Sequence, residues 1–175
     1  MNSSQHKHLV LVGMMGSGKS SVGRLLNHQH GIRFLDTDFE VVQRCQCSLP
    51  ELFASKGEAA FRELERDVVR DAVTNEESMI ISTGGGTVIT PENRDLLWKN
   101  GFVVYLKAEL DTLLERVSHD TNRPLLKEGD PVETLKKLLL QRASFYDQAH
   151  LTLQVDRMNP RLVASRIWSH FSKRR

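Results

Sequence analysis

The sequence has only two cysteines, and it lacks any long run of apolar residues. Cys45 and Cys47 form a C-x-C pair without a partner cluster, so a structural zinc site, which usually has about four ligands, is not indicated and we expect free thiols. A membrane-spanning helix would need about 20 consecutive apolar residues, and the polar segment 1–8 lacks the apolar core of a signal peptide. These absences predict a cytoplasmic protein without a membrane partner.

An excess of one charge sign is also missing. The 24 Lys and Arg residues nearly balance the 22 Asp and Glu residues, which leaves a net charge of +2 and no strong field to attract nucleic acid. The length of 175 residues suits one domain of about 100–200 residues, and neither a repeat nor a proline-rich or serine-rich linker divides the chain. We therefore expect a single domain over residues 1–175 that binds small molecules rather than nucleic acid and acts as a monomer.

Apolar runs typical of β-strands alternate with helical patterns along the whole chain. This alternation predicts an α/β fold in which helices cover a parallel sheet. One polar segment, residues 118–131, contains Arg123 and lies between two helical patterns; a loop of this length in a compact domain is often a lid. The predicted strands are residues 9–12, 32–35, 79–82, 102–106 and 151–155.

Helix punctuation is clear between residues 48 and 74. Ser48 and Glu51 have the spacing of a capping box, and Gly57 is expected to end the short helix that they begin. The next helix is predicted to run from about residue 58 to residue 74, with its charged residues on the solvent side. Its apolar stripe consists of Phe61, Leu64, Val68 and Ala72.

The segment 13–20, Gly-Met-Met-Gly-Ser-Gly-Lys-Ser, directly follows the first predicted strand and precedes a helical pattern. This is the setting of a phosphate-binding loop: its glycines let backbone N–H groups approach a triphosphate, and the start of the helix faces the anion. Lys19 suits the β- and γ-phosphates, and the Ser20 hydroxyl suits a Mg²⁺ ion that accompanies ATP. The residues predicted to bind ATP here are Gly16, Ser17, Gly18, Lys19, Ser20 and Ser21.

Two aspartates follow the second predicted strand, at the edge of a parallel sheet where ligands bind. Asp36 is placed to hold Mg²⁺ through water, and Asp38 is placed to accept the proton of an attacking hydroxyl group. The alternative is that these aspartates only cap the helix that begins near Phe39.

Further candidate residues are spread along the rest of the chain. The Thr-Gly-Gly-Gly segment 83–86 exposes bare backbone, which suits a substrate lying flat against it. Arg62 and Glu65 are three residues apart, so Glu65 can orient the guanidinium, although such a pair is often only a surface ion pair. Arg123 in the predicted lid can close on a triphosphate as an arginine finger does. Together with Arg142, these residues describe an acceptor that carries hydroxyl groups and a carboxylate.

In their chain order, these motifs resemble those of the shikimate kinase family, and the likeness extends from about Leu9 to Phe171. The matching motifs are the phosphate-binding loop, Asp-Thr-Asp at 36–38, Phe-Arg-Glu-Leu-Glu at 61–65, Thr-Gly-Gly-Gly at 83–86, Arg-Pro-Leu-Leu at 123–126, and Arg142 four residues before Tyr146. The resemblance implies a three-layer P-loop kinase fold, with a five-stranded parallel sheet in the order 2-3-1-4-5 and helices on both faces. It also implies a lid at about 118–131, a substrate-binding helical region at about 39–66, and transfer of the ATP γ-phosphoryl group to the 3-hydroxyl of shikimate in aromatic amino acid biosynthesis.

The resemblance also implies a role for each matching residue. The implied catalytic residues are Lys19, Asp38 and Arg123. ATP would contact the phosphate-binding loop, Arg116 and Arg123, while Mg²⁺ would be held by Ser20 and, through water, by Asp36. Shikimate would be bound by Asp38, Arg62, Gly84, Gly85, Gly86 and Arg142. The loop 157–160 lies where the family usually holds the other side of the adenine base, and Ser144 stands where the family often has a proline.

Other functions share parts of this pattern. Gluconate kinase and adenylylsulfate kinase have the same kind of phosphate-binding loop and acceptor chemistry, but are not expected to combine the triple-glycine segment with both arginines. A GTP-binding switch would need a guanine-reading Asn-Lys-x-Asp motif, which the sequence lacks. A non-catalytic nucleotide-binding regulator is disfavoured because Lys19, Asp38 and Arg123 are all present.

Overall fold

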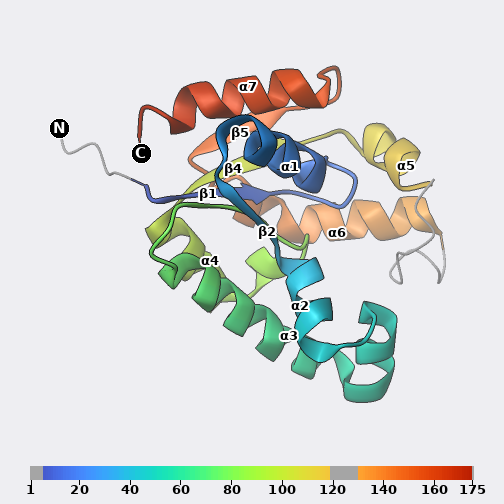
Figure 1. Cartoon of the computed structure of the whole chain (residues 1–175). Coiled ribbons are helices and arrows are strands. Elements are labelled where there is room, and N and C mark those ends of the chain that lie inside the picture. The colour runs from blue at the N-terminus through green and yellow to red at the C-terminus, as the bar shows by residue number, and fades with distance from the viewer. Residues whose placement is uncertain (1–5, 119–129, 175) are drawn as a thin grey trace.

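A computed structural model describes residues 6–118 and 130–174 and places them in three layers around a five-stranded sheet (Figure 1). The strand order is β2-β3-β1-β4-β5, and every neighbouring pair is parallel, which confirms the expected topology. All five predicted strands are present, with ends within one residue of the prediction. The strands are β1 (His8–Val12), β2 (Arg33–Asp36), β3 (Met79–Ser82), β4 (Gly101–Lys107) and β5 (Leu151–Gln154).

Helices cover both faces of the sheet, as expected. In Figure 1, α1 and α7 lie on one side of the strands, and α3, α4 and α6 lie on the other. The helices are α1 (Lys19–His30), α2 (Thr37–Cys45), α3 (Leu49–Thr74), α4 (Pro91–Asn100), α5 (Leu110–Ser118), α6 (Pro131–Tyr146) and α7 (Pro160–Phe171), with a short 3₁₀ turn η1 (Thr87–Ile89). The predicted lid at about 118–131, with Arg123, lies outside the described residues except at its two ends.

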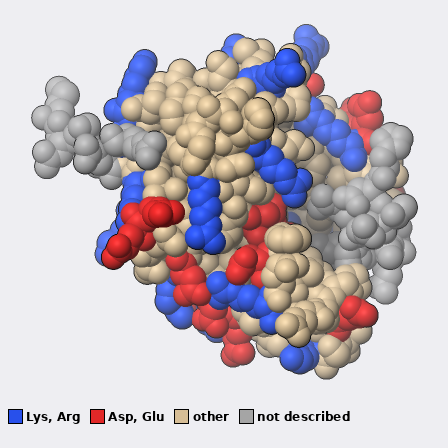
Figure 2. All heavy atoms as spheres, viewed as in Figure 1, with Lys and Arg blue, Asp and Glu red and all other residues tan. Residues whose placement is uncertain are grey.

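The hydrophobic core lies on both faces of the central strands. All residues of β1 and β3 are buried, which explains why these strands read as continuous apolar runs instead of alternating patterns. Within residues 6–118 and 130–174, no helix is both long enough and apolar enough to cross a membrane. Basic and acidic side chains are interspersed over the face shown in Figure 2, in keeping with the small net charge.

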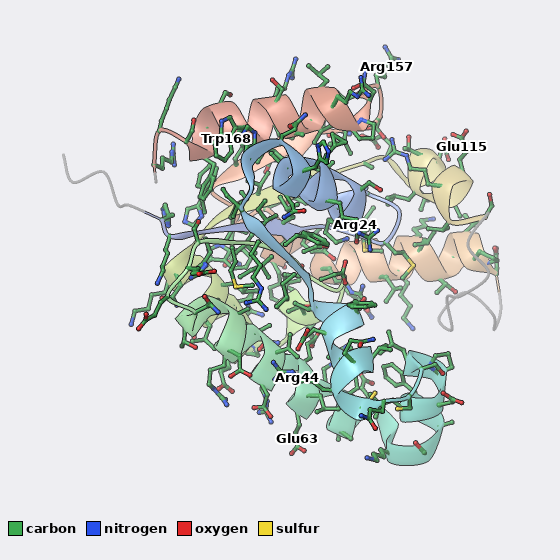
Figure 3. All side chains as sticks on the ribbon, viewed as in Figure 1. Arg24, Arg44, Glu63, Glu115, Arg157 and Trp168 are labelled. Carbon is green, nitrogen blue, oxygen red and sulfur yellow. The ribbon has the colours of Figure 1, made fainter. Side chains whose placement is uncertain are left out.

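A second, smaller apolar cluster holds α2 against α3. Arg44 adds a polar link: it extends from α2 toward α3 (Figure 3), and its Nη1 lies 2.8 Å from Oδ2 of Asp71. α2 and the first part of α3 project from the sheet at the carboxyl end of β2, whereas the rest of α3 runs beside α4 (Figure 1). The cluster consists of Val41, Leu52, Phe61 and Val68.

The local signals around α3 are confirmed, with one exception. Ser48 and Glu51 form a complete capping box, and Gly57 breaks the helix with a φ of 78° and a ψ of 176°. The exception is Glu65, which was expected on the solvent side with the other charged residues and is only 1% exposed. Its burial is compensated because both carboxylate oxygens have partners, Arg62 for one and Thr87 for the other.

Three histidines lie where β1 and β4 meet the end of the chain: His8 is buried, His6 is half-buried and His150 is exposed. His8 is fully buried, and its Nε2–H donates to the carbonyl oxygen of Val73 at 3.1 Å. The rings of His6 and His150 are 4.7 Å apart. Burial lowers the pKa of each of the three, and the charge of Arg174 lowers the pKa of His6 and His150 further.

We expect the free energy of unfolding to fall when the pH is lowered from about 7.5 to about 5.5. The unfolded chain takes up protons near a pKa of about 6.5, whereas the native rings stay neutral to lower pH, so acid favours the unfolded state. Each extra proton contributes at most about 1.4 kcal/mol per pH unit. Urea denaturation at several pH values measures the slope of the unfolding free energy against pH. This slope should be smaller in His8→Gln than in the unchanged protein. The exposed His28 provides a control. If His8→Gln leaves the slope of the unfolding free energy against pH unchanged while His28→Gln alters it, the account is contradicted.

Candidate functional site

The loop between β1 and α1 wraps around the end of Lys19. Gly13, Gly16 and Gly18 have φ angles of 145°, 79° and 95°, a region that side chains with a Cβ rarely adopt. The Lys19 ammonium donates to the carbonyl oxygens of Gly13 at 2.8 Å and Met14 at 2.9 Å. Because α1 begins at Lys19, its first backbone N–H groups have no partner within the helix and are available to an anion at the loop.

The sequence left two roles open for Asp36, to hold Mg²⁺ or to cap a helix, and its two carboxylate oxygens have contacts that suit both. Its Oδ1 caps α2 by accepting from the backbone N–H groups of Asp38 at 3.2 Å and Phe39 at 3.4 Å. Its Oδ2 accepts from the hydroxyl groups of Ser20 at 2.6 Å and Ser82 at 3.2 Å. A hydroxyl and a carboxylate therefore meet beside the phosphate-binding loop, and this small oxygen set suits Mg²⁺, which keeps most of its ligands as water and phosphate oxygens. Among the described residues, no group of three or more His, Cys, Asp or Glu side chains forms a denser metal site.

A cavity of about 570 Å³ crosses the carboxyl ends of the strands. Its lining includes Asp36 at the end of β2, Asp38 just beyond it, and Val155 and Met158 after β5. Because β2 and β5 are the two edge strands, the cavity extends across the sheet at the edge where ligands bind. The phosphate-binding loop lines its middle with Gly16, Ser17, Gly18, Lys19, Ser20 and Ser21.

The β5 end of the cavity has the features of a site for a nucleotide base. Arg116 on α5 donates to the carbonyl oxygens of Gly16 and Val155, both at 3.3 Å, and so bridges the phosphate-binding loop to the end of β5. Met158 and Pro160 lie in the predicted base-binding loop and line the cavity together with Val163. No sequence pattern marks Val155 or Val163 as cavity residues, because both are typical core residues of a strand and a helix.

The three consecutive glycines after β3 are required by space rather than by backbone conformation. None of the three has a φ in the left-handed region. A Cβ on Gly84 would overlap the carboxylate of Asp38, and one on Gly85 would lie 3.2 Å from Nη1 of Arg142. A Cβ on Gly86 would lie 2.9 Å from Nη2 of Arg62. The glycine segment therefore gathers three predicted acceptor-binding side chains, which come from α2, α3 and α6.

A buried carboxylate fixes the orientation of Arg62. Its Nη1 donates to Oε2 of Glu65 at 2.8 Å, and Oε1 of Glu65 accepts from the Thr87 hydroxyl at 2.7 Å. Burial opposes the charged form of Arg62, but the charges of Glu65 and Glu58 outweigh it and raise the arginine pKa. These contacts place Glu65 where its predicted role, the orientation of the Arg62 guanidinium, requires it. Thr87 was missed because a threonine after a glycine turn carries no distinctive pattern.

Arg142 is buried beside the same glycine segment, with 4% of its side chain exposed. Its neighbour Tyr146 donates from Oη to the carbonyl oxygen of Gly85 at 2.6 Å and so ties α6 to the segment. Burial raises the pKa of the Tyr146 hydroxyl, which keeps its proton for this hydrogen bond. Sequence reasoning used Tyr146 only to locate Arg142 and missed its contact with Gly85.

We expect Gly86→Ala to raise the KM for the acceptor by about tenfold to a hundredfold, because the new methyl group must displace the Arg62 guanidinium. The melting temperature should change little, since the displaced atoms are the far end of a flexible side chain. Steady-state kinetics and thermal denaturation measure the two effects.

Gly101→Ala is the matched control for this glycine. Its methyl group would overlap Cγ2 of Val10 in the core, so we expect a loss of about 1–3 kcal/mol in stability with the acceptor KM unchanged. The account of the glycine segment fails if Gly86→Ala leaves the acceptor KM unchanged.

Comparisons with known proteins agree with this geometry. The family model described as Shikimate kinase matches residues 15–172. A shikimate kinase of Xylella fastidiosa (strain M12) is 41% identical over 161 residues, which cover 91% of this chain and 89% of the relative. A shikimate kinase of Caldicellulosiruptor saccharolyticus is 39% identical over 168 residues, which cover 95% of this chain and 97% of the relative.

A solved structure is also similar over nearly the whole chain. Shikimate kinase from Acinetobacter baumannii, in complex with shikimate, matches with a TM-score of 0.91 and 33% identity, covering 97% of this chain and 95% of that one. The fold is therefore the P-loop kinase fold that the motifs implied. Because the family match and both relatives extend over most of its length, the chain belongs to the shikimate kinase family and is a kinase.

Proposed function

We propose that this chain transfers the γ-phosphoryl group of ATP to the 3-hydroxyl of shikimate, giving ADP and 3-phosphoshikimate for aromatic amino acid biosynthesis. Family membership supports the reaction. In this proposal the chain works as a single-domain, cytoplasmic monomer, with Mg²⁺ accompanying ATP.

The observation that carries the acceptor assignment is the environment of Arg142. Within the described residues, its Nε has no hydrogen-bond partner, and none of the ion pairs formed there involves this arginine. A buried cation without an anion is costly, so the site is suited to a ligand that brings a negative charge. Shikimate has a carboxylate, and a guanidinium can bind one through two parallel hydrogen bonds.

Arg62 and Asp38 complete the proposed acceptor site. Both side chains pack against the same glycine segment as Arg142, so a small molecule lying there can contact all three. We assign the carboxylate of shikimate to the two arginines and its hydroxyl groups to Asp38. The helical region at about 39–66, which includes most of α2 and more than half of α3, then forms the acceptor-binding part of the molecule. Gly84, Gly85 and Gly86 form the floor of its site.

The rest of the cavity accommodates ATP in this proposal. Lys19 and the loop residues bind the phosphates, while Arg116 and the apolar residues after β5 hold the base. Ser20 and, through water, Asp36 would hold Mg²⁺, which supplies charge neutralisation for the β- and γ-phosphates when bound. We keep Arg123 as a further phosphate ligand, on the basis of its motif alone.

The proposed step is a displacement at phosphorus. Asp38 accepts the proton of the 3-hydroxyl, and the hydroxyl oxygen forms a bond to the γ-phosphorus. The bond from the γ-phosphorus to the β–γ bridging oxygen breaks, and ADP leaves with that oxygen. Lys19 and the N–H groups at the start of α1 offset the negative charge on the transferring group.

We expect Arg142→Ala to weaken shikimate binding by about 2–5 kcal/mol and to leave the KM for ATP nearly unchanged. Shikimate methyl ester should be a poor substrate for the unchanged enzyme because it lacks the anionic carboxylate. Initial rates with each acceptor measure both effects.

Arg166→Ala, on the exposed face of α7, is the control and should match the unchanged protein in both constants. An ester that reacts as well as the acid would contradict the arginine assignment without contradicting kinase activity.

A further inference from the structure

The turn between α2 and α3 brings two sulfur atoms together. Cys45 is the last residue of α2, and Gln46 adopts a left-handed conformation with φ 52° and ψ 32°. This conformation turns the chain so that the Sγ atoms of Cys45 and Cys47 lie 3.0 Å apart. Both side chains are partly exposed, at the edge of the apolar cluster between the two helices.

The pair does not have the surroundings of a metal site. In the part of the chain that the structure describes, no third His, Cys, Asp or Glu joins the two thiols in a metal-binding group. The pair also differs from ordinary core cysteines, which are buried and have no reason to face each other. Two accessible thiols with their sulfurs in contact instead suit reaction with each other.

We propose that Cys45 and Cys47 form a reversible thiol–disulfide exchange site whose oxidant is a low-molecular-weight disulfide. One cysteine thiolate attacks a sulfur atom of the small disulfide, forms a mixed disulfide and releases one small thiolate. The second cysteine loses its proton and attacks the protein sulfur of that mixed disulfide, which closes the 45–47 bond and releases the second small thiolate. The two protein thiols are oxidised by two electrons, and the small disulfide is reduced to two thiols.

The geometry favours exchange over a permanent cross-link. The sulfur atoms must approach from 3.0 Å to about 2.05 Å, so only a small local movement is needed. The bond would close a loop of only three residues, which removes little entropy from the unfolded chain and so stabilises the fold little. A disulfide in such a small, exposed ring is easily reduced, which is typical of labile rather than structural disulfides.

Neighbouring contacts keep the two thiols in position while they react. The capping box of Ser48 and Glu51 fixes the chain directly after Cys47, and the ion pair of Arg44 with Asp71 fixes the end of α2. The hydrogen bond from Cys47 to Cys45 raises the pKa of the Cys47 thiol, so Cys47 keeps its proton and points at the Cys45 sulfur before reaction.

The test uses the reduced, full-length protein and oxidised glutathione. Intact mass under non-reducing conditions should show the loss of two hydrogen atoms and no retained glutathione, and peptide mapping should place the bond between Cys45 and Cys47. Dithiothreitol should restore the original mass. Because these two residues are the only cysteines of the chain, every change in thiol content can be assigned to them.

Two variants separate ring closure from simple thiol reactivity. Cys45→Ser and Cys47→Ser should each retain one glutathione, since the second thiol that would expel it is missing. If either variant does not fold, the intact mass of the unchanged protein still shows whether the ring closes. The proposal is overturned if the unchanged protein does not react, or if it retains glutathione on one or both cysteines instead of closing the ring.

Discussion

Lys19→Met is expected to reduce kcat by roughly 10³-fold or more while the protein remains folded. The ammonium is held by the carbonyl oxygens of Gly13 and Met14, at the centre of the phosphate-binding loop. Methionine keeps the apolar stem of this buried side chain but removes the charge, so the β- and γ-phosphates lose a fixed cation as negative charge shifts between them. ADP release under saturating ATP and shikimate measures the loss.

Lys99→Ala is the matched control for the loss of one positive charge. Lys99 is exposed in the last turn of α4, away from the cavity lining, and its removal should leave kcat unchanged. Circular dichroism should show that both variants are folded. Full activity in Lys19→Met would contradict the assignment of this lysine to the transferring phosphate.

Asp38→Asn is expected to lower kcat by about 10²–10⁴-fold, because the amide keeps the shape of the side chain but cannot accept a proton. Asp38 lines the cavity in the first turn of α2, and its carboxylate packs against Gly84. The separate determination of kcat and of the KM for shikimate is the decisive measurement. A general base affects kcat, whereas a residue that only binds the acceptor affects KM.

The control is Asp95→Asn. Asp95 is an exposed residue on α4, so this variant should have the kcat of the unchanged protein. If Asp38→Asn keeps its kcat and only raises the KM for shikimate, Asp38 binds the acceptor but is not the base. The proposed proton transfer would then be wrong, although the acceptor site would remain.

The features that could be predicted from the sequence depend on local patterns. The phosphate-binding loop needs glycines, a lysine and a helix start within eight consecutive residues, and the parallel strands need only short apolar runs between helices. The capping box at Ser48 and the break at Gly57 are local in the same sense. For this reason the order of elements and the ends of the strands followed from the residues and the family likeness.

The features that could not be predicted depend on contacts between distant residues. Nothing in the pattern of α3 separates Glu65 from its exposed charged neighbours, because its burial depends on Thr87 in another element. The sequence likewise suggested that the glycines provide bare backbone for a substrate. The structure adds a different reason, since each glycine makes room for a side chain from another helix: Asp38, Arg142 or Arg62.

The most direct test of the proposed reaction compares acceptors in one assay. ADP release from ATP and Mg²⁺ is measured with shikimate, gluconate or adenylylsulfate, and the product is examined by phosphorus NMR. The account predicts rapid ADP release with shikimate alone, together with a phosphate ester on its 3-hydroxyl. Release with gluconate or adenylylsulfate but not with shikimate would contradict it.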